Sequence, residues 1–403
     1  MRLATWLSCA AVGLALASPA RAEHIKIGVI LPYSGTNADL GDVQDKSFDL
    51  YLKLHAKNIA PHTVELIKRD EGAPSGANAK TVATELITRD KVDLLLGVVF
   101  SPSAIAMAPV VTQAKIPFII ANAGTAWITQ LSPYIVRFSF SMWHDGYAMG
   151  SYAKDNLSCK TAATAYTDFP PGKDSTEAFK TAFEKAGGKI TDAVPMGNPA
   201  QVPDMTPFFQ RIKDAKPDCM FVFIPSGSHA AAVVKTYGQL AMRQAGIKLI
   251  GPKDVVPDSK LQDMGDAAIG TIVMSSYSND IDNPENKAFV KAWHAAYGPD
   301  NYPDFESANA WDAIDAVFKT IKKLNGKFDS EAFVNTIKTY SASGPRGKVS
   351  IDPATRDIVN DEYAMEVVRK PDGKLGTKIL GRIEQVKDPC KELKVGPCAG
   401  QTN

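Results

Sequence analysis

The chain has 403 residues, of which 45% are hydrophobic and 22% are charged, and its formal net charge is +1. This is the composition of a globular protein with enough apolar material for two cores, so we expect two domains. A balanced charge without a Lys/Arg stripe argues against nucleic acid as a partner.

The N-terminal segment has the pattern of a secretory signal peptide. An apolar run follows Arg2, and the tripeptide ending at Ala22 is a small-x-small cleavage site. We therefore expect residues 1–22 to be a signal peptide and the mature protein to be soluble and periplasmic. Removing them changes the formal net charge to −1, since they carry two arginines and no acid. No later segment offers the roughly 18 consecutive apolar residues of a membrane span.

From His24 onward, short β-branched runs alternate with longer stretches of helical period. Near-continuous apolar strands in such an alternation indicate a parallel sheet covered on both faces. The first series is IKIGVILP (25–32), DVQDKSFDLYLKLHAK (42–57), VELIKRDE (64–71), ANAKTVATELITRD (77–90), VDLLLGVVF (92–100), PSAIAMAPVVTQAK (102–115) and IPFIIANA (116–123).

The alternation begins again after residue 140. The second series is HDGYAMGSYAKDNL (144–157), TAATAYTDF (161–169), DSTEAFKTAFEKAGG (174–188), KITDAVPM (189–196), MTPFFQRIKDAK (205–216), CMFVFIP (219–225), HAAAVVKTYGQLAMRQAG (229–246) and KLIGP (248–252). Three successive helical stretches follow (284–298, 305–326 and 330–340), and then three strands (348–351, 363–370 and 377–386). The late helices lack strands for a core of their own, so we expect them to pack on the earlier domains.

These patterns predict an α/β fold of two doubly wound parallel-sheet lobes joined by a hinge that the chain crosses several times. The expected division gives residues 23–140 and 277–345 to lobe 1, residues 141–276 and 346–388 to lobe 2, and residues 389–403 to a C-terminal tail. The expected crossings are Phe138 to Met142, Ser275 to Ser278, and Pro345 to Val349. Several crossings between two domains make a hinge and leave a cleft between them.

Four cysteines follow the signal peptide, and an even number suits an oxidising compartment. Cys390 and Cys398 lie in a polar tail with turn residues, so we expect a short disulfide loop there. Cys159 and Cys219 each precede a strand-like run and are either neighbours or separate buried thiols. We favour thiols, because bridges across adjacent strands tend to be strained. Neither pair has the spacing of a zinc site, so no metal is expected.

The motifs of common enzymes are absent. The sequence contains no G-x-S-x-G elbow, no HExxH pair and no GxGxxG dinucleotide fingerprint. We therefore expect no catalytic residue and no cofactor.

Two neighbouring predicted strands end in polar groups. Ser101, before Pro102, is placed to cap a helix, and the same helix start can hold a carboxylate. The next strand leads to Ala123, Thr125 and Trp127 at the same sheet edge. Ligands of open α/β sheets bind beyond such carboxyl ends, so these residues suggest a site for a polar ligand.

With these loops, the chain resembles the periplasmic solute-binding proteins of the leucine/isoleucine/valine-binding family, the type I periplasmic binding proteins. The resemblance extends from IKIGVILPYSG, through residues 69–125, to GTIVMSSYS. It implies a monomer that closes on a small solute and delivers it to an ABC transporter permease. It also implies that Ser101, Ala123 and Thr125 hold the α-carboxylate and ammonium of the ligand, with Tyr33 or Leu40 contributing a side wall.

The second lobe departs from the family's amino-acid binders. In the loop LIGPKDVVPD, Lys253 most nearly takes the place of the acid that pairs with a ligand's ammonium. An ammonium would be repelled there, whereas a second carboxylate or an uncharged ring would not. Ser226 follows another strand of this lobe and is a further candidate contact. Aromatic residues at candidate cleft loops, among them Phe100, Phe169 and Trp127, can stack on a flat ligand.

We therefore expect a periplasmic binding component of an ABC importer whose ligand is a small carboxylate, either an aromatic or other apolar acid or a branched-chain or hydrophobic amino acid. The alternatives are a sensory module for a membrane receptor, a binder of amide- or urea-type solutes and, with less support, a secreted hydrolase.

Overall fold

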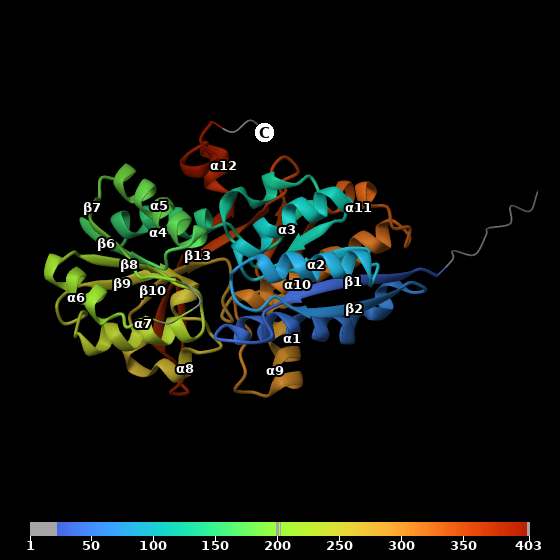
Figure 1. Cartoon of the computed structure of the whole chain (residues 1–403). Coiled ribbons are helices and arrows are strands. Elements are labelled where there is room, and N and C mark those ends of the chain that lie inside the picture. The colour runs from blue at the N-terminus through green and yellow to red at the C-terminus, as the bar shows by residue number, and fades with distance from the viewer. Residues whose placement is uncertain (1–21, 199–200, 202, 401–403) are drawn as a thin grey trace, which may run out of the picture.

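The computed structural model describes residues 22–198, 201 and 203–400, so residues 1–21 of the expected signal peptide lie outside the described part. Two lobes lie side by side, with the C-terminal helix α12 (Pro389–Leu393) above the junction between them (Figure 1). The expected α/β fold of two lobes is confirmed. Within the described residues, no helix is both long and apolar enough to cross a membrane.

The first lobe is built on a parallel sheet of order β2-β1-β3-β4-β5. Its strands are β1 (His24–Leu31), β2 (Thr63–Asp70), β3 (Leu94–Gly97), β4 (Phe118–Ile120) and β5 (Ile135–Arg137). Its helices are α1 (Ala38–His55), η1 (Ala56–Ile59), α2 (Ala77–Thr88), α3 (Ser101–Ala114), η2 (Ala126–Leu131), α10 (Phe305–Lys323) and α11 (Ser330–Ile337). The helix α9 (Pro284–Tyr297) precedes α10 and contacts α1.

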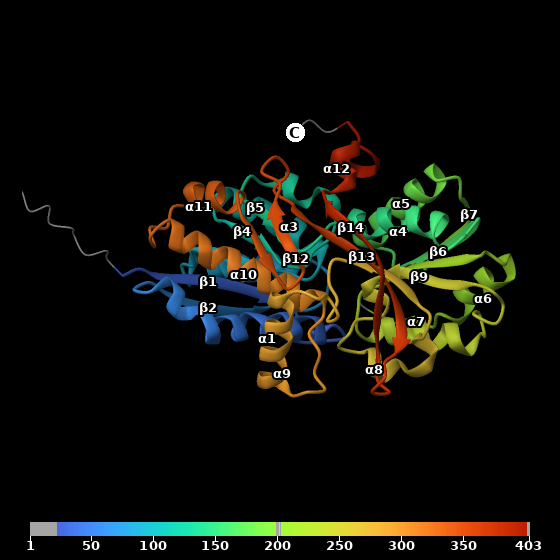
Figure 2. The same ribbon diagram turned by 180° about the vertical axis from the view of Figure 1, so that it is seen from behind.

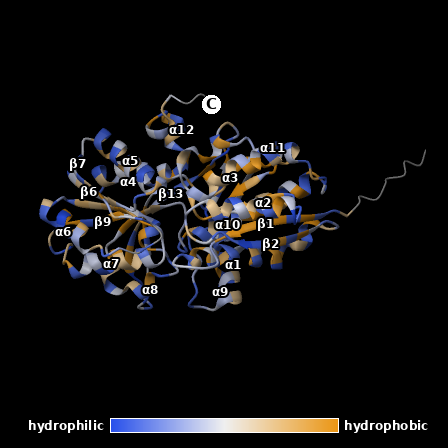
Figure 3. Ribbon diagram, viewed as in Figure 1, coloured by the Kyte–Doolittle hydropathy of each residue, from blue (hydrophilic) through white to orange (hydrophobic). Residues whose placement is uncertain are grey.

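Successive residues of these strands pack in two different cores, one on each face of the sheet. Val29 and Leu96 pack with α1 and α10 on one face, whereas Ile30 and Leu95 pack with α2 and α3 on the other. Because both faces are covered, the strands are apolar throughout, as Figure 3 shows for β1. This is the doubly wound arrangement that the sequence predicts.

The second lobe contains a parallel sheet of order β10-β9-β8-β6-β7, which the antiparallel strand β13 extends beside β10. Its strands are β6 (Thr161–Tyr166), β7 (Lys189–Pro195), β8 (Cys219–Phe223), β9 (Lys248–Pro252) and β10 (Ile272–Ser275). Its helices are α4 (Met142–Asp155), α5 (Pro170–Lys185), α6 (Thr206–Ala215), α7 (Ser228–Gln239), η3 (Lys253–Val255), α8 (Leu261–Met264) and η4 (Gly265–Ala268). The remaining elements are β11 (Ser341–Gly344), β12 (Gly347–Ile351), β13 (Ile358–Arg369), β14 (Leu375–Val386), α12 (Pro389–Leu393) and η5 (Gly396–Cys398).

The long strand β13 joins the lobes, as the view from behind shows (Figure 2). Val349 in β12 and Ile358 at the start of β13 pack in the core of the first lobe, whereas Met365 and Val367 pack in the core of the second. The third crossing therefore lies within β13, and the expected division at Pro345 to Val349 is wrong.

Arg346 connects the segments that cross between the lobes. Its guanidinium is fully buried and pairs with Asp312 of α10 at 2.7 Å. It also donates to the carbonyl oxygen of Phe138 at 2.8 Å and that of Ser139 at 3.1 Å. A longer contact, 3.4 Å, reaches Ser276 Oγ. One side chain thus fixes the first two crossings to the turn between β11 and β12.

Both cysteine pairs are joined by disulfides. Cys390 and Cys398 close the expected loop in the tail, with their Cα atoms 5.5 Å apart. Cys159 and Cys219 are bonded as well, with a Cα separation of 6.0 Å. The expectation of free thiols is therefore wrong: β6 and β8 are adjacent, and the pairing of Ala162 with Cys219 brings Cys159 alongside.

Candidate ligand-binding site

A cavity lies between the lobes, and it has about 30 Å³ of free space in this arrangement. The roughly 300–1,000 Å³ typical of small-ligand sites is much larger, so a ligand requires the lining side chains or the lobes to move apart. The residues that line it are Leu40, Val99, Phe100, Ser101, Asn122, Gly124, Phe140, Met142, Phe169, Pro171, Phe223, Pro225, Ser226, Asp254 and Glu306. Most follow the carboxyl ends of strands in the two sheets, where open α/β sheets bind their ligands.

Four phenylalanines make the walls aromatic: Phe100, Phe140, Phe169 and Phe223. The rings of Phe169 and Phe223 lie 6.1 Å apart between centroids and are tilted by 33°. The rings of Phe140 and Phe305 pack edge-on with 5.8 Å between their centroids, and this contact supports Phe140. Such walls suit a flat apolar ligand. Phe140 and Phe223 were not among the expected contacts, although Phe223 ends a strand and the strand-end rule covers it.

Ser101 lies at the start of α3 and lines the cavity. Phe100 is the N-cap residue and the helix begins at Ser101, so the expected capping role of the serine is wrong. Instead, Ser101 Oγ accepts a hydrogen bond from the backbone N–H of Thr125 at 3.1 Å. A hydroxyl has one donor besides its acceptor sites, so the O–H of Ser101 is left to donate to a ligand.

A buried glutamate supports the strand that leads to α3. Glu71 Oε1 accepts the backbone N–H of Val99 at 2.7 Å. Burial raises the pKa of Glu71 to about 8. The residue follows β2 in the segment RDEG. Nothing in the neighbouring sequence distinguishes it from a solvent-exposed acid in a loop.

Two carboxyl groups also line the cavity. Asp254 follows β9, Glu306 lies in the first turn of α10, and both are buried. Burial raises the pKa of Asp254 to about 7. Burial and the neighbouring Asp304 raise that of Glu306 well above its ordinary range. Glu306 was not expected here, because a first-turn glutamate normally marks only a helix start.

Lys253 does not reach this cavity. Its buried ammonium donates to Asp258 at 3.0 Å, which neutralises it within its own loop. The expectation that a lysine replaces the acid is therefore wrong, since the next residue, Asp254, faces the cavity. The argument that this loop repels an ammonium no longer holds.

Of the nine expected contact residues, four line the cavity: Phe100, Ser101, Phe169 and Ser226. The other five lie beside or behind it: Tyr33, Ala123, Thr125, Trp127 and Lys253. Tyr33 donates its hydroxyl to Asp45 at 3.0 Å, and Ala123 packs in the core between the sheet and α3. Trp127 lies in η2, and Thr125 reaches the site through its N–H bond to Ser101.

The lobes touch on both sides of the cavity. Asp174 of α5 accepts the backbone N–H of Ala126 at 2.8 Å, and Lys260 lies 3.5 Å from Asp39 of α1. A Cβ added to Gly227 would lie 2.7 Å from Asp39 Oδ2, so glycine lets the two lobes approach there. The structure therefore represents the closed arrangement of the lobes.

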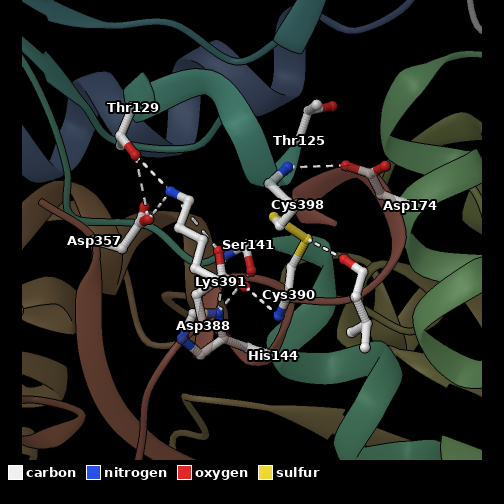
Figure 4. Close-up of a disulfide and its surroundings, with 12 residues drawn as sticks. Thr125, Thr129, Ser141, His144, Asp174, Asp357, Asp388, Cys390, Lys391 and Cys398 are labelled. Atoms are coloured by element: carbon white, nitrogen blue, oxygen red, sulfur yellow. Dashed lines mark hydrogen bonds and ion pairs between the residues drawn. A yellow bond between two sulfur atoms is a disulfide. The ribbon is translucent and has the colours of Figure 1, made fainter. Parts of the chain in front are cut away.

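The disulfide-closed tail packs where the lobes meet (Figure 4). Cys390 and Cys398 form a small core with Ala126 of the first lobe and Trp143 and Ala178 of the second. Lys391 donates to Thr129 Oγ1 at 2.5 Å and also pairs with Asp357 (Figure 4).

Arg137 belongs to the same network of buried charges as Lys391 and Asp357. Its Nε donates to Asp357 at 2.7 Å, and its Nη1 donates to the carbonyl oxygen of Thr125 at 2.7 Å. The same network therefore fixes the loop whose N–H group binds Ser101.

The family model for periplasmic binding proteins matches residues 24–374. The chain belongs to the periplasmic binding protein family. A relative from Brucella melitensis, the Leu/Ile/Val-binding protein homolog 6, is 34% identical over 383 residues, which cover 95% of this chain and 97% of that protein.

Solved structures of solute-binding proteins are similar to this periplasmic binding protein. One, from Rhodopseudomonas palustris BisB5 in complex with 3,4-dihydroxybenzoic acid, is 39% identical, has a TM-score of 0.86 and is aligned over 91% of this chain and 99% of its own. Another, from R. palustris in complex with 4-hydroxybenzoate, is 38% identical with a TM-score of 0.86 and coverages of 91% and 98%.

The raised pKa of the cavity acid predicts how the stability of this binding protein depends on pH. The pKa of Asp254 is about 7 in the fold and about 4 in an unfolded chain. Between these values the unfolded state loses its proton first, so stability falls as the pH rises from about 4 to 7. We expect Asp254→Asn, which cannot ionise, to weaken this dependence.

Urea unfolding of the ligand-free protein at pH 5 and pH 8 measures this effect. The matched control is Asp263→Asn, an exposed change in the same lobe, which should keep the wild-type dependence. Equal pH dependence in the wild type and Asp254→Asn would contradict the assignment.

Proposed function

We propose that this protein is the solute-binding component of an ABC importer. In this proposal it is a periplasmic monomer that closes on an aromatic carboxylate, delivers it to the permease subunits and catalyses no reaction. The two R. palustris proteins that are 39% and 38% identical to this chain were solved with hydroxylated benzoic acids. Membership of the periplasmic binding protein family supports the transport role.

The observation that carries the proposed ligand class is the combination of aromatic walls with a helix start. The N–H groups of the first turn of α3 and the Ser101 hydroxyl are suited to a carboxylate. Phe169 and Phe223 from the second lobe, with Phe100 from the first, form apolar surfaces for a ring. In the proposed complex, Ser101 donates to the carboxylate, and the ring lies between Phe100 and Phe169 near Ser226.

A hydrophobic amino acid is the second candidate. The Brucella relative is named for leucine, isoleucine and valine, and Asp254 offers a carboxylate to an ammonium. A panel of benzoate, hydroxybenzoates, leucine, valine and phenylalanine in a thermal-shift assay separates the candidates, because a ligand that binds only the folded state raises the Tm. We expect shifts with aromatic acids and no product. A shift with the aliphatic amino acids alone would replace the aromatic proposal.

A sensory role would use the same cavity, so ligand binding does not separate sensing from import. Capture of the ligand-loaded protein by permease subunits supports import, whereas capture by a membrane receptor alone supports sensing.

Ser101→Ala is expected to weaken binding of aromatic acids roughly 10-fold to 150-fold, because a hydrogen bond to a charged group contributes about 1.5–3 kcal/mol. Isothermal titration calorimetry measures the change. Ser330→Ala, at the start of α11 and outside the cavity, is the control and should bind as the wild type does. Unchanged affinity in Ser101→Ala would move the carboxylate away from α3.

A further inference from the structure

The cavity lining offers two kinds of hydrogen-bonding group. Donors come from the hydroxyl of Ser101 and the start of α3 in the first lobe. Carboxyl groups come from Asp254 in η3 of the second lobe and Glu306 in α10 of the first. A ligand whose carboxylate binds at Ser101 therefore shares the cavity with two acids.

Each of these acids has an oxygen without a partner. Asp254 is 8% exposed and Glu306 is 2% exposed, and both line the cavity. Within the described part of the chain, neither Asp254 Oδ2 nor Glu306 Oε2 has a hydrogen-bond partner. Buried polar groups in folded proteins are normally paired, so an unpaired oxygen that lines a binding cavity points to a donor on the ligand.

Two neighbouring acids already have hydrogen-bond partners within the protein. Asp258 accepts from Lys253 at 3.0 Å, and Asp304 caps α10 by accepting the backbone N–H of Ser307 at 3.2 Å. Asp258 Oδ2 is also without a partner, but Asp258 does not line this cavity, whereas Asp254 and Glu306 do.

We propose that Asp254 and Glu306 form a subsite for a phenolic hydroxyl, so that the protein selects ring-hydroxylated aromatic carboxylates over unsubstituted ones. This inference rests on the proposed function, because it assumes an aromatic carboxylate in the cavity. It assigns the selection to two acids of the cavity lining, in addition to Ser101.

The chemistry of the pair favours a hydroxyl over an ammonium. Burial, the charge of Asp304 and then the charge of Asp254 raise the pKa of Glu306, so Glu306 resists ionisation while Asp254 is charged. One protonated and one ionised carboxyl group provide both a donor and acceptors. A phenolic hydroxyl donates and accepts, so it can bond to both, whereas an ammonium only donates.

Calorimetric titration of the wild-type protein with benzoate, 4-fluorobenzoate and 4-hydroxybenzoate tests the subsite without a mutation. Fluorine adds a small substituent that cannot donate a hydrogen bond. We expect 4-hydroxybenzoate to bind at least about 10-fold more tightly than the other two acids, as one recovered hydrogen bond to a charged group allows.

Variants then assign the preference to the two acids. Asp254→Ala and Glu306→Ala are each expected to reduce the hydroxybenzoate-to-benzoate preference to less than about 3-fold, whereas Asp263→Ala, exposed in the same lobe, should keep it. Circular dichroism and the Tm establish whether each variant is folded. If a variant is not folded, the titration of the wild-type protein with the three acids still tests the subsite.

The outcomes separate the two proposals. If no aromatic acid binds, the proposed function fails. If benzoate binds as tightly as 4-hydroxybenzoate, or if both alanine variants keep the preference, only the subsite is overturned. Leucine binding that both variants abolish would show instead that the acids bind an ammonium.

Discussion

Replacing Asp357 with alanine is expected to lower the free energy of unfolding by about 3–5 kcal/mol, the range for removing one partner of a buried ion pair. Asp357 is 1% exposed and lies between Arg137 and Lys391, which are also buried. Burial alone would raise its pKa, but the two cations outweigh this effect and hold the pKa below its ordinary value. Without the carboxylate, two cations remain close together in the interior.

Urea unfolding at neutral pH measures this loss. Asp282→Ala is the matched control, because Asp282 pairs with Lys287 at the surface, with both side chains well exposed. That variant should unfold as the wild type does, since exposed pairs contribute little. A small loss in Asp357→Ala, similar to the control, would show that the network does not depend on this carboxylate.

Arg346→Ala should have a comparable effect, about 3–5 kcal/mol, because it too removes one partner of a buried ion pair. It leaves Asp312 buried without its partner and frees the carbonyl oxygens of Phe138 and Ser139 at the first crossing. Because these bonds connect the crossings, we also expect the two lobes to unfold less cooperatively. A chemical denaturation curve followed by two probes, one in each lobe, detects this difference.

Arg89→Ala is the control for this experiment, because its guanidinium is largely exposed on the first lobe. The denaturation curve of that variant should superimpose on that of the wild type. A cooperative transition of wild-type midpoint in Arg346→Ala would rule out a structural role for the arginine at the hinge.

The order of elements was predictable because each parallel strand is buried on both faces and is therefore a short apolar run between helical patterns. The order of the strands within each sheet was not predicted from the sequence: β3 is central in the first lobe, and β8 is central in the parallel sheet of the second. The third crossing was misplaced because β12 has the apolar pattern of any strand. Which lobe receives Val349 and Ile358 depends on tertiary packing alone.

The candidate site was predictable where it follows strand ends. Ser101, Phe100, Phe169 and Ser226 come directly after strands, and all four line the cavity. The acids were not predictable, because a local pattern does not show which of two adjacent residues faces inward. Lys253 was expected at the cavity, but Asp254 lies there for this reason, since the lysine pairs with Asp258, five residues later.

The pairing of Arg137 with Asp357 spans 220 residues of sequence, which has a consequence for synthesis. The sheet of the first lobe is translated first, but α10 and β12, which complete one of its cores, come after the whole parallel sheet of the second lobe. A nascent chain that has reached residue 340 therefore holds Arg137 without its carboxylate. Neither lobe completes its core until the ribosome has almost finished the chain, because Ile358 packs in the core of the first lobe and Met365 in that of the second.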